Sequence, residues 1–251
     1  MNKRVEYFTL TNITSVHLGD VIHLMNGIYS LAIQENFYAI IHTKNLVVKQ
    51  LLDIFDYDER IELSEINHPL KYPLTFKKIF FSNLDFCMGE MCGVIRGHTS
   101  IEPIKIKKIF LPKNKLGNID KKNYKCFQLD SFSLGPQKKY LSFNEIKKII
   151  ELFGNDNSYY IGRPETKIYL PNVKVHFSNL FEQSKFLLGS QGFFGIDSGM
   201  SHLAGSLGVS GDVIIQRSFD QKILESWYNH MYPSLRTHNR KILSKKMIYI
   251  L

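Results

Sequence analysis

Residues 195–208 read GIDSGMSHLAGSLG, and they follow the apolar pair Phe193–Phe194. The apolar run Gly192–Ile196 predicts a buried strand, and the residues after the polar turn predict a helix that continues to about Leu207. Helices that follow buried strands are typical of proteins with parallel sheets. This stretch therefore predicts an α/β fold and marks one strand-to-helix turn within it.

The turn is rich in groups that bind anions. Backbone N–H groups and the positive end of the helix dipole meet at a helix N-terminus. Gly199 lets a phosphate approach the backbone, Ser198 can donate a hydrogen bond, and His202 lies one turn further along. The turn is therefore a candidate diphosphate site. In a purely structural alternative, Asp197 or Ser198 caps the helix and Gly199 eases the turn, which explains one capping residue but not the whole set.

The composition is that of a folded, basic protein. Of the 251 residues 44% are hydrophobic, which is enough for one large core or two small ones. The formal net charge of +9 favours an anionic partner such as nucleic acid, a phosphorylated glycan or a membrane surface. Solubility alone is the ordinary alternative for such a charge.

Targeting signals and cysteine usage indicate the compartment. No stretch has the roughly 18 to 20 apolar residues of a membrane-spanning helix, and the first residues do not resemble a signal peptide. Cys87, Cys92 and Cys126 lack the spacing of zinc ligands and are expected to be reduced structural thiols. We expect a cytoplasmic protein, in the host cytoplasm if the chain is viral, with peripheral contact at the inner membrane as a further option.

Short apolar runs rich in β-branched and aromatic residues recur along the chain and predict strands. These runs are residues 5–10, 37–41, 78–81, 106–111, 124–129, 159–162, 173–177, 192–196 and 213–216. Apolar residues at helical spacing lie between some of them, over 21–32 and 146–153. The second helix opens with a capping box at Ser142–Glu145 and stops at Gly154. Strands that alternate with helices imply parallel sheets with covered faces.

The basic stretch Lys105–Lys125 is the best candidate for a domain boundary. It carries eight lysines against one acid, Asp120, and contains Pro112 and Gly117. We interpret it as the hinge between two α/β halves. The tail after Tyr232–Pro233 is basic again.

The first strand-to-helix turn, SVHLGDVIH at residues 15–23, is a second candidate site. Asp20 lies at the start of the helix predicted over 21–32, where a carboxylate is an ordinary cap or dipole partner. Its functional alternative is a general base that takes a proton from a nucleophilic hydroxyl. His17 and His23 lack metal-ligand spacing, so a structural or substrate-contacting role is favoured.

Taken together and in this order, the two turns resemble the heptosyltransferases, the glycosyltransferases that extend the inner core of lipopolysaccharide. LGDVIH at residues 18–23 matches the family's Leu-Gly-Asp-Val turn, and DSGMSHLAGSLG at 197–208 matches its D-S-G-x-x-H-L-A-x-x-L-G signature. QKKY at 137–140 resembles the family's Lys-Arg-Trp segment, and YIGRPE at 160–165 resembles its Gly-Gly-Pro-Glu loop. The resemblance extends from about residue 5 to residue 216, and the closing motif is its most specific part.

The resemblance implies the GT-B fold, in which two Rossmann-like domains face one another across a cleft. On that basis residues 1–118 form an acceptor-binding domain. Residues 119–251 form a nucleotide-sugar-binding domain, with a C-terminal helix that could return to the first domain. An inverting, metal-independent transfer is also implied, with the nucleotide-sugar donor as cosubstrate and no other cofactor.

Residue roles follow from the same resemblance. Asp20 is the implied catalytic base, and His17 and His23 are assigned to the acceptor. The residues assigned to the donor are Lys138, Lys139, Gly162, Asp197, Ser198, Gly199, His202 and Arg217. The chemistry is reasonable in itself, because a helix N-terminus with lysine and histidine can stabilise a departing diphosphate where other enzymes use Mg²⁺.

The chain also departs from the family. Residues 216–220 read QRSFD where the family commonly has a Gly-x-Thr turn near the donor, so ADP-heptose is not assumed, and Arg217 could contact a phosphate. Family members are usually longer, which predicts a trimmed acceptor domain.

Two further patterns have ordinary interpretations. Asp56-Tyr57-Asp58 matches the D-x-D metal clamp of the GT-A glycosyltransferases, but it follows the helix predicted over 46–55 and is interpreted as a solvated helix end. No metal site is expected. Trp227 and Tyr228 lie on a predicted helix after the last strand, where packing is favoured over stacking on a base or sugar.

Three functions remain open from the sequence. The favoured one is transfer of a sugar to a lipopolysaccharide-type saccharide, with the basic 105–125 stretch and tail docked on phosphates at the inner leaflet. The second is a phage-type DNA glycosyltransferase acting on a hydroxymethylated base, whose phosphates the positive charge would track. The third is a non-catalytic module that binds a nucleotide sugar or nucleic acid.

Overall fold

The computed structural model describes residues 4–9, 18–64, 71–73, 109–130, 141–154, 156–161, 173–215, 225, 228–229 and 231–239. The chain divides into two compact units, Met1–Leu116 and Gly117–Leu251. The division falls inside the lysine-rich stretch 105–125. Gly117 has a φ of 72°, a left-handed backbone conformation that glycine adopts without steric cost.

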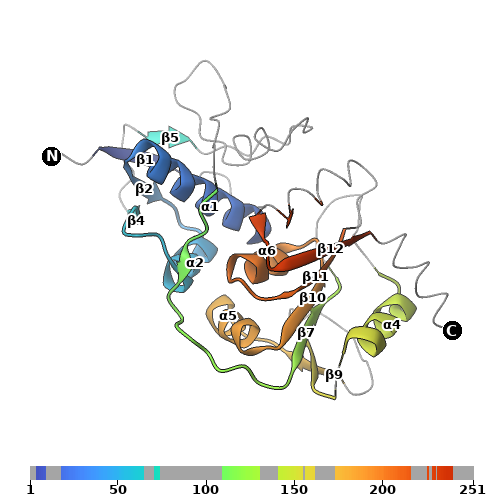
Figure 1. The fold of residues 1–251 in the computed structure, drawn as a ribbon. Coiled ribbons are helices and arrows are strands. Elements are labelled where there is room, and N and C mark those ends of the chain that lie inside the picture. The colour runs from blue at the N-terminus through green and yellow to red at the C-terminus, as the bar shows by residue number, and fades with distance from the viewer. Residues whose placement is uncertain are drawn as a thin grey trace. The chain divides into compact units, whose positions relative to one another are not determined.

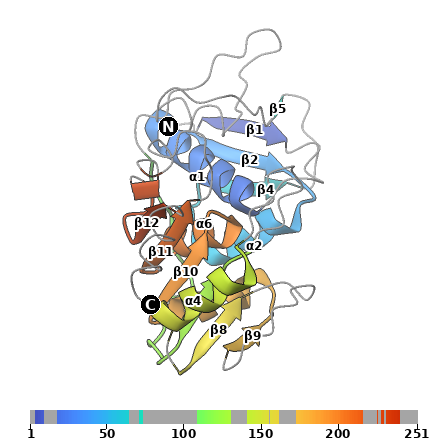
Figure 2. The ribbon, with the colours of Figure 1, turned by 90° about the vertical axis from the view of Figure 1, so that its right-hand side faces the viewer.

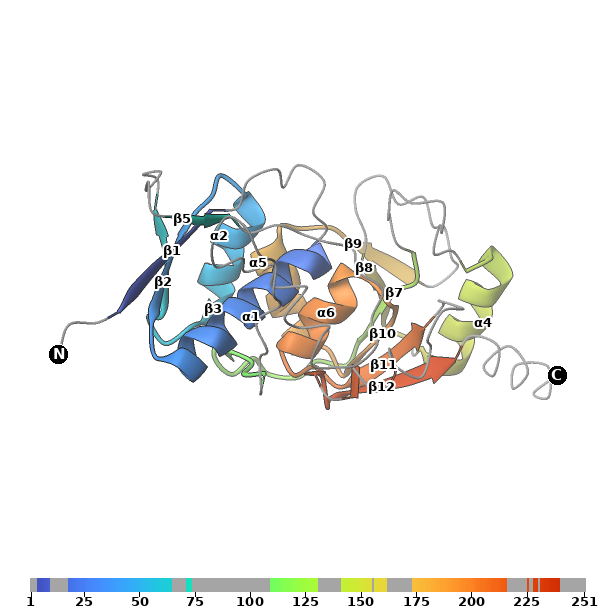
Figure 3. The same ribbon diagram turned by 90° about the horizontal axis from the view of Figure 1, so that it is seen from above.

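The first unit is built on a four-stranded parallel sheet with the order β4-β2-β1-β5 (Figure 1). Its elements are β1 (Val5–Thr9), α1 (Leu18–Glu35), β2 (Tyr38–His42), α2 (Leu46–Ile54), β4 (Ile61–Ser64) and β5 (Lys71–Pro73), with β3 (Phe55–Asp56) paired antiparallel to β6 (Lys113–Asn114). Within this unit α1 and α2 lie on the same side of the sheet (Figure 3). The strands predicted near 5–10 and 37–41 and the helices predicted near 21–32 and 46–55 are confirmed.

The long helix α1 is held by its apolar stripe. Val21, Leu24, Met25, Ile28 and Leu31 are each at most 1% exposed. Burial of a side chain of this size stabilises a fold by roughly 1.5–3 kcal/mol. The apolar spacing read from the sequence therefore describes the face on which α1 packs.

The strand predicted over 106–111 is wrong in its described part, because residues 109–112 form no strand. The hydroxyl of Ser30 on α1 accepts a hydrogen bond from the Phe110 N–H at 2.9 Å. The same hydroxyl lies 3.4 Å from the Phe110 carbonyl oxygen. Because the single hydroxyl proton of Ser30 is donated to the Asn26 carbonyl at 2.7 Å, this side chain binds only the Phe110 N–H that a neighbouring strand would otherwise bind. The strand predicted at 78–81 lies outside the described residues.

The second unit contains a six-stranded, fully parallel sheet with the order β12-β11-β10-β7-β8-β9 (Figure 2). Its elements are β7 (Lys125–Gln128), α4 (Phe143–Phe153), β8 (Ser158–Ile161), β9 (Val173–His176), α5 (Leu180–Gly189), β10 (Gly192–Ile196), α6 (Gly199–Ser206), β11 (Gly211–Ile215) and β12 (Leu235–Asn239). Helices α5 and α6 cover one face and α4 the other (Figure 3). The strands predicted near 124–129, 159–162, 173–177, 192–196 and 213–216 are confirmed.

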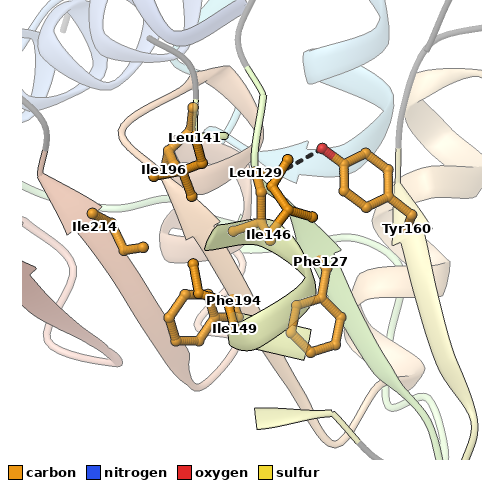
Figure 4. Close-up of a cluster of buried hydrophobic side chains, with 9 residues drawn as sticks. All are labelled: Phe127, Leu129, Leu141, Ile146, Ile149, Tyr160, Phe194, Ile196 and Ile214. Atoms are coloured by element: carbon orange, nitrogen blue, oxygen red, sulfur yellow. Dashed lines mark hydrogen bonds between the residues drawn. The ribbon is translucent and has the colours of Figure 1, made fainter. Parts of the chain in front are cut away.

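Helix α4 begins and ends where its sequence predicts. The Ser142 hydroxyl accepts a hydrogen bond from the Glu145 N–H, and the Glu145 carboxylate accepts one from the Ser142 N–H, so the capping box is formed. The Gly154 N–H closes the last turn on the Ile150 carbonyl. Figure 4 shows Ile146 and Ile149 of α4 packed over the sheet with side chains from four strands; the cluster is Phe127, Leu129, Leu141, Ile146, Ile149, Tyr160, Phe194, Ile196 and Ile214.

Edge strand β12 lies in the basic tail, which the sequence did not indicate as a strand. Its polar residues are held by one buried carboxylate: Asp212 of β11 accepts a hydrogen bond from Arg236 at 3.0 Å and lies 2.7 Å from His238 Nε2. Burial opposes ionisation of Asp212, but the hydrogen bonds from His238 and Arg236 outweigh it and lower the pKa of this carboxyl. Asp212 therefore fastens the edge of the sheet.

We expect Asp212→Asn to lower the free energy of unfolding at neutral pH. The difference in free energy between this variant and the native chain should shrink in acid. A carboxyl whose folded pKa is depressed stabilises the fold above its unfolded pKa and loses that contribution as the pH falls through the folded pKa. The loss should therefore begin below about pH 4. Urea denaturation of both chains from pH 7 down to pH 3 checks this, and a deficit that is constant across the range would contradict it.

The predicted α/β fold class with parallel sheets is thus confirmed. Cys126, also predicted to be a structural thiol, is buried and in no disulfide, and burial raises its pKa to about 12. None of the described helices combines the length and apolar character needed to cross a bilayer.

Candidate diphosphate site

The sheet of the second unit reverses its winding between β7 and β10. From β7 the chain adds β8 and β9 on one side, and it then returns to add β10, β11 and β12 on the other. In open α/β sheets ligands bind outside the carboxyl ends of the strands at such a reversal. The carboxyl ends of β7 and β10 are Gln128 and Ile196, and the turn Asp197-Ser198 follows directly. The sequence motif therefore lies at the expected ligand position.

A hydrogen bond across the reversal holds this turn. The Ser198 hydroxyl donates to Gln128 Oε1 at 2.5 Å, and both residues are buried. The Asp197 N–H continues the ladder to β11 by donating to the Ile214 carbonyl oxygen at 3.1 Å. The turn is therefore tied to the strands on both sides of β10.

The N-terminus of α6 is not capped by a side chain. Ser198 occupies the N-cap position, but its side chain makes no capping hydrogen bond. By contrast, Asn45, Ser142 and Asn179 cap α2, α4 and α5 through their side chains. The structural alternative in which Ser198 caps the helix is therefore wrong, because Gln128 takes its hydroxyl. The Ser198 side chain thus leaves the first N–H groups of α6 uncapped, and these are the groups that bind anions at helix N-termini.

Asp197 and His202 meet a third residue, Tyr228, in the interior. The Tyr228 hydroxyl donates to Asp197 Oδ1 at 2.8 Å and lies 3.4 Å from His202 Nε2. His202 Nε2 is 3.5 Å from Asp197 Oδ1. The exposed fractions of Asp197, His202 and Tyr228 are 6%, 7% and 0%. The motif's acid and histidine thus belong to one buried polar cluster.

No protein-family model and no curated protein matches the sequence. Solved structures do match the coordinates. The fold matches that of the heptosyltransferases.

Three matching structures illustrate the heptosyltransferase fold. Heptosyltransferase WaaC of E. coli with ADP superposes with a TM-score of 0.57 at 10% identity, over 98% of this chain and 99% of that one. A glycosyltransferase of family 9 from Veillonella parvula gives a TM-score of 0.59 at 11% identity, over 100% and 90%. The iron-containing dodecameric glycosyltransferase TibC of enterotoxigenic E. coli gives 0.57 at 13% identity, over 85% of this chain and 58% of its own. This chain thus spans little more than half of TibC, and identities this low establish the fold alone.

The residues assigned to the acceptor side lie in the first unit. Asp20 is the third residue of α1, and α1 is the first helix after β1, but the Asp20 side chain lies outside the described part of the structure. His23, one turn further along α1, is 1% exposed, a burial typical of a packed side chain. His17 lies outside the described residues.

Of the residues assigned to the donor, the structure describes only those at the start of α6, which we call the motif turn. Asp197, Ser198, Gly199 and His202 come together at the start of α6. The other four lie outside the described residues: Lys138, Lys139, Gly162 and Arg217. In the chain, Gly162 directly follows β8, Arg217 follows β11 by two residues, and both lysines fall between β7 and α4. Their donor roles stay predictions.

The D-x-D pattern has structural roles, although not as the solvated end of a helix. Helix α2 ends at Ile54, and Asp56 caps the following turn by accepting a hydrogen bond from the Asp58 N–H at 3.0 Å. Asp58 accepts a hydrogen bond from the Tyr29 hydroxyl of α1. Burial and this contact raise the pKa of Tyr29. In the described part of the chain, no group of three or more His, Cys, Asp or Glu side chains is arranged to hold a metal.

Sequence reasoning missed Gln128 and underestimated Tyr228. Gln128 interrupts the apolar run 124–129 at the carboxyl end of its strand, and this polar interruption is the signal that could have indicated it. The sequence predicts a packing role for Tyr228, and its ring does stack on His202, with centroids 5.2 Å apart. Its hydrogen bond to Asp197 had no sequence signal, because 31 positions separate the two residues.

Proposed function

We propose that this chain is a glycosyltransferase that moves a sugar from a nucleotide-diphosphate sugar to a hydroxyl of a lipopolysaccharide-type saccharide. The observation that carries the proposal is the motif turn. Asp197, Ser198 and the uncapped start of α6 lie at the winding reversal of a doubly wound parallel sheet. The heptosyltransferase fold of the matching structures supports the same activity.

The proposed chemistry is a single displacement without a metal ion. Asp20 removes the proton from the acceptor hydroxyl as its oxygen forms a bond to the anomeric carbon. The bond from that carbon to the donor diphosphate breaks, and the electron pair leaves with the diphosphate. The start of α6, together with Lys138, Lys139 and His202, stabilises the charge that develops there. Attack opposite the leaving group inverts the anomeric centre.

The two sides of the reaction are assigned to different units. Donor binding is assigned to the second unit, through the motif turn with Gly162 and Arg217, and acceptor binding to the first, through His17. An acceptor rich in phosphate suits the chain's formal net charge of +9. We therefore favour an anionic saccharide acceptor, met in the cytoplasm or at the inner membrane surface.

Thermal stabilisation by a panel of nucleotide sugars tests donor binding. A ligand that binds only the folded state at 100 times its Kd stabilises that state by about 2.7 kcal/mol, so the cognate donor should raise the Tm by several degrees. Matched nucleoside monophosphates are the control, since they lack the diphosphate that the site is proposed to hold. If no nucleotide sugar raises the Tm and none is hydrolysed, the proposal fails.

Product analysis with the stabilising donor then identifies the acceptor. A lipopolysaccharide core saccharide should gain the sugar, whereas duplex DNA with hydroxymethylated bases should not. Sugar transferred to the DNA alone would contradict the saccharide acceptor. The anomeric configuration of the product, read by NMR coupling constants, tests inversion in the same sample.

A further inference from the structure

Tyr228 brings a separate part of the chain to the motif turn. Tyr228 and Tyr232 both lie after β11 in the chain. Tyr232 packs directly on α6, because a Cβ added at Gly205 of that helix would lie 2.4 Å from the Tyr232 Cγ. The Tyr232 ring lies 5.7 Å from the His202 ring and meets the Tyr228 ring edge-on. The segment is therefore held tightly where Tyr228 meets Asp197 and His202.

The hydrogen bonds of Tyr228 have a direction. A tyrosine hydroxyl carries one proton, and here it is donated to Asp197 Oδ1 at 2.8 Å. The hydroxyl oxygen also lies 3.4 Å from His202 Nε2, and Asp197 Oδ1 lies 3.5 Å from the same nitrogen. Both contacts are favourable only if Nε2 carries a proton, because both oxygens can only accept from it. The cluster therefore selects the Nε2-protonated form of His202.

We propose that Tyr228 is a positioning residue for donor binding: its hydroxyl holds the Asp197 carboxylate and the His202 ring in place at the start of α6, where the diphosphate of the donor is proposed to bind. The inference rests on the proposed function, because it names the residue that organises the same site. Tyr228 itself is fully buried, so it acts through the two motif residues. Its hydroxyl couples the segment after β11 to the start of α6.

Tyr228→Phe tests the proposal because it removes the hydroxyl and keeps the ring that stacks on His202. We expect the Kd of the nucleoside diphosphate that binds best among ADP, GDP, UDP and CDP to rise about tenfold, since a buried carboxylate loses its donor. The donor KM should rise in parallel, with a smaller change in kcat. Calorimetric titration and initial-rate measurements give these values.

Tyr232→Phe is the matched control. It removes a buried hydroxyl from the same segment, next to the same histidine ring. The Tyr232 hydroxyl interacts first with Ser206 and more weakly with the charge of Asp197. The Kd of Tyr232→Phe for the same nucleoside diphosphate should stay within about twofold of the native value. Its loss of Tm should be comparable to that of Tyr228→Phe. Equal weakening of binding by both variants, or native binding by Tyr228→Phe, overturns the inference and leaves the proposed function standing. If the native chain binds no nucleoside diphosphate, the proposed function falls and takes the inference with it.

The protonation pattern of His202 provides a readout that does not require a ligand. The chain has nine histidines, and the ring ¹⁵N resonances of His202 can be assigned by their loss in His202→Gln. The native spectrum should report a proton on Nε2, and Tyr228→Phe should shift it towards a mixture of forms. If Tyr228→Phe does not fold, Asp197→Asn should alter the same resonances. An unchanged ring spectrum in a folded variant contradicts the positioning role.

Discussion

Replacement of Asp20 by asparagine is expected to lower the rate of sugar transfer by roughly 10²- to 10⁴-fold, the usual contribution of a general base. An amide of the same shape cannot take the proton from the acceptor hydroxyl. Because donor binding is assigned to the second unit, the Kd for the donor should stay close to the native value. The measurement is kcat with saturating donor and acceptor, together with a donor titration.

Asp53→Asn is the control for this variant. Asp53 lies exposed near the end of α2 in the same unit, so the same chemical change there should leave the rate within about twofold. Asp20 also lies in the first turn of α1, where a carboxylate stabilises the helix through its dipole. A helix-stabilising role alone would lower the Tm and leave kcat nearly native, and that result would refute the base assignment. If the native chain binds the donor but transfers no sugar, the alternative of a non-catalytic binding module is favoured.

Replacement of Gly211 by alanine is expected to lower the free energy of unfolding by about 3 kcal/mol or more, at the upper end of the cost of overpacking. The added Cβ would lie 2.1 Å from the Phe193 carbonyl oxygen and 2.9 Å from its carbonyl carbon. Gly211 and Phe193 are register partners in β11 and β10. The oxygen belongs to the backbone of a central strand, which cannot withdraw without breaking the ladder.

Gly192→Ala provides a matched comparison in the adjacent strand. A Cβ at Gly192 would lie 3.4 Å from its nearest neighbour, the Ser210 carbonyl oxygen, which is an ordinary contact. We expect a change within about 0.5 kcal/mol. Urea denaturation followed by circular dichroism measures both variants. Equal stability of the two variants would contradict the β10–β11 register. If only Gly211→Ala loses stability, it should also bind the donor more weakly, because β10 carries the motif turn.

Secondary structure was predictable where the local pattern and the packing agree. The capping box at Ser142 and the apolar stripe of α4 describe a helix that can bury its face in one way only. Prediction failed where the structure of a segment depends on a partner that is distant in the sequence. Residues 109–111 have the apolar character of a strand, but Ser30 from α1 binds the Phe110 N–H. Strand β12 has a polar sequence and depends on Asp212 for its place.

The motif turn shows the same division. Sequence alone determined that a polar turn joins a buried strand to a helix, since apolar runs and turn residues are local properties of the chain. Tertiary structure alone decided that Ser198 bonds to Gln128 instead of capping α6, and that Asp197 and His202 share Tyr228. These partners lie 70, 31 and 26 positions away from the turn residues that they bind. Such contacts form only when the parallel sheet brings the carboxyl ends of its strands to one edge, and no local pattern encodes that meeting.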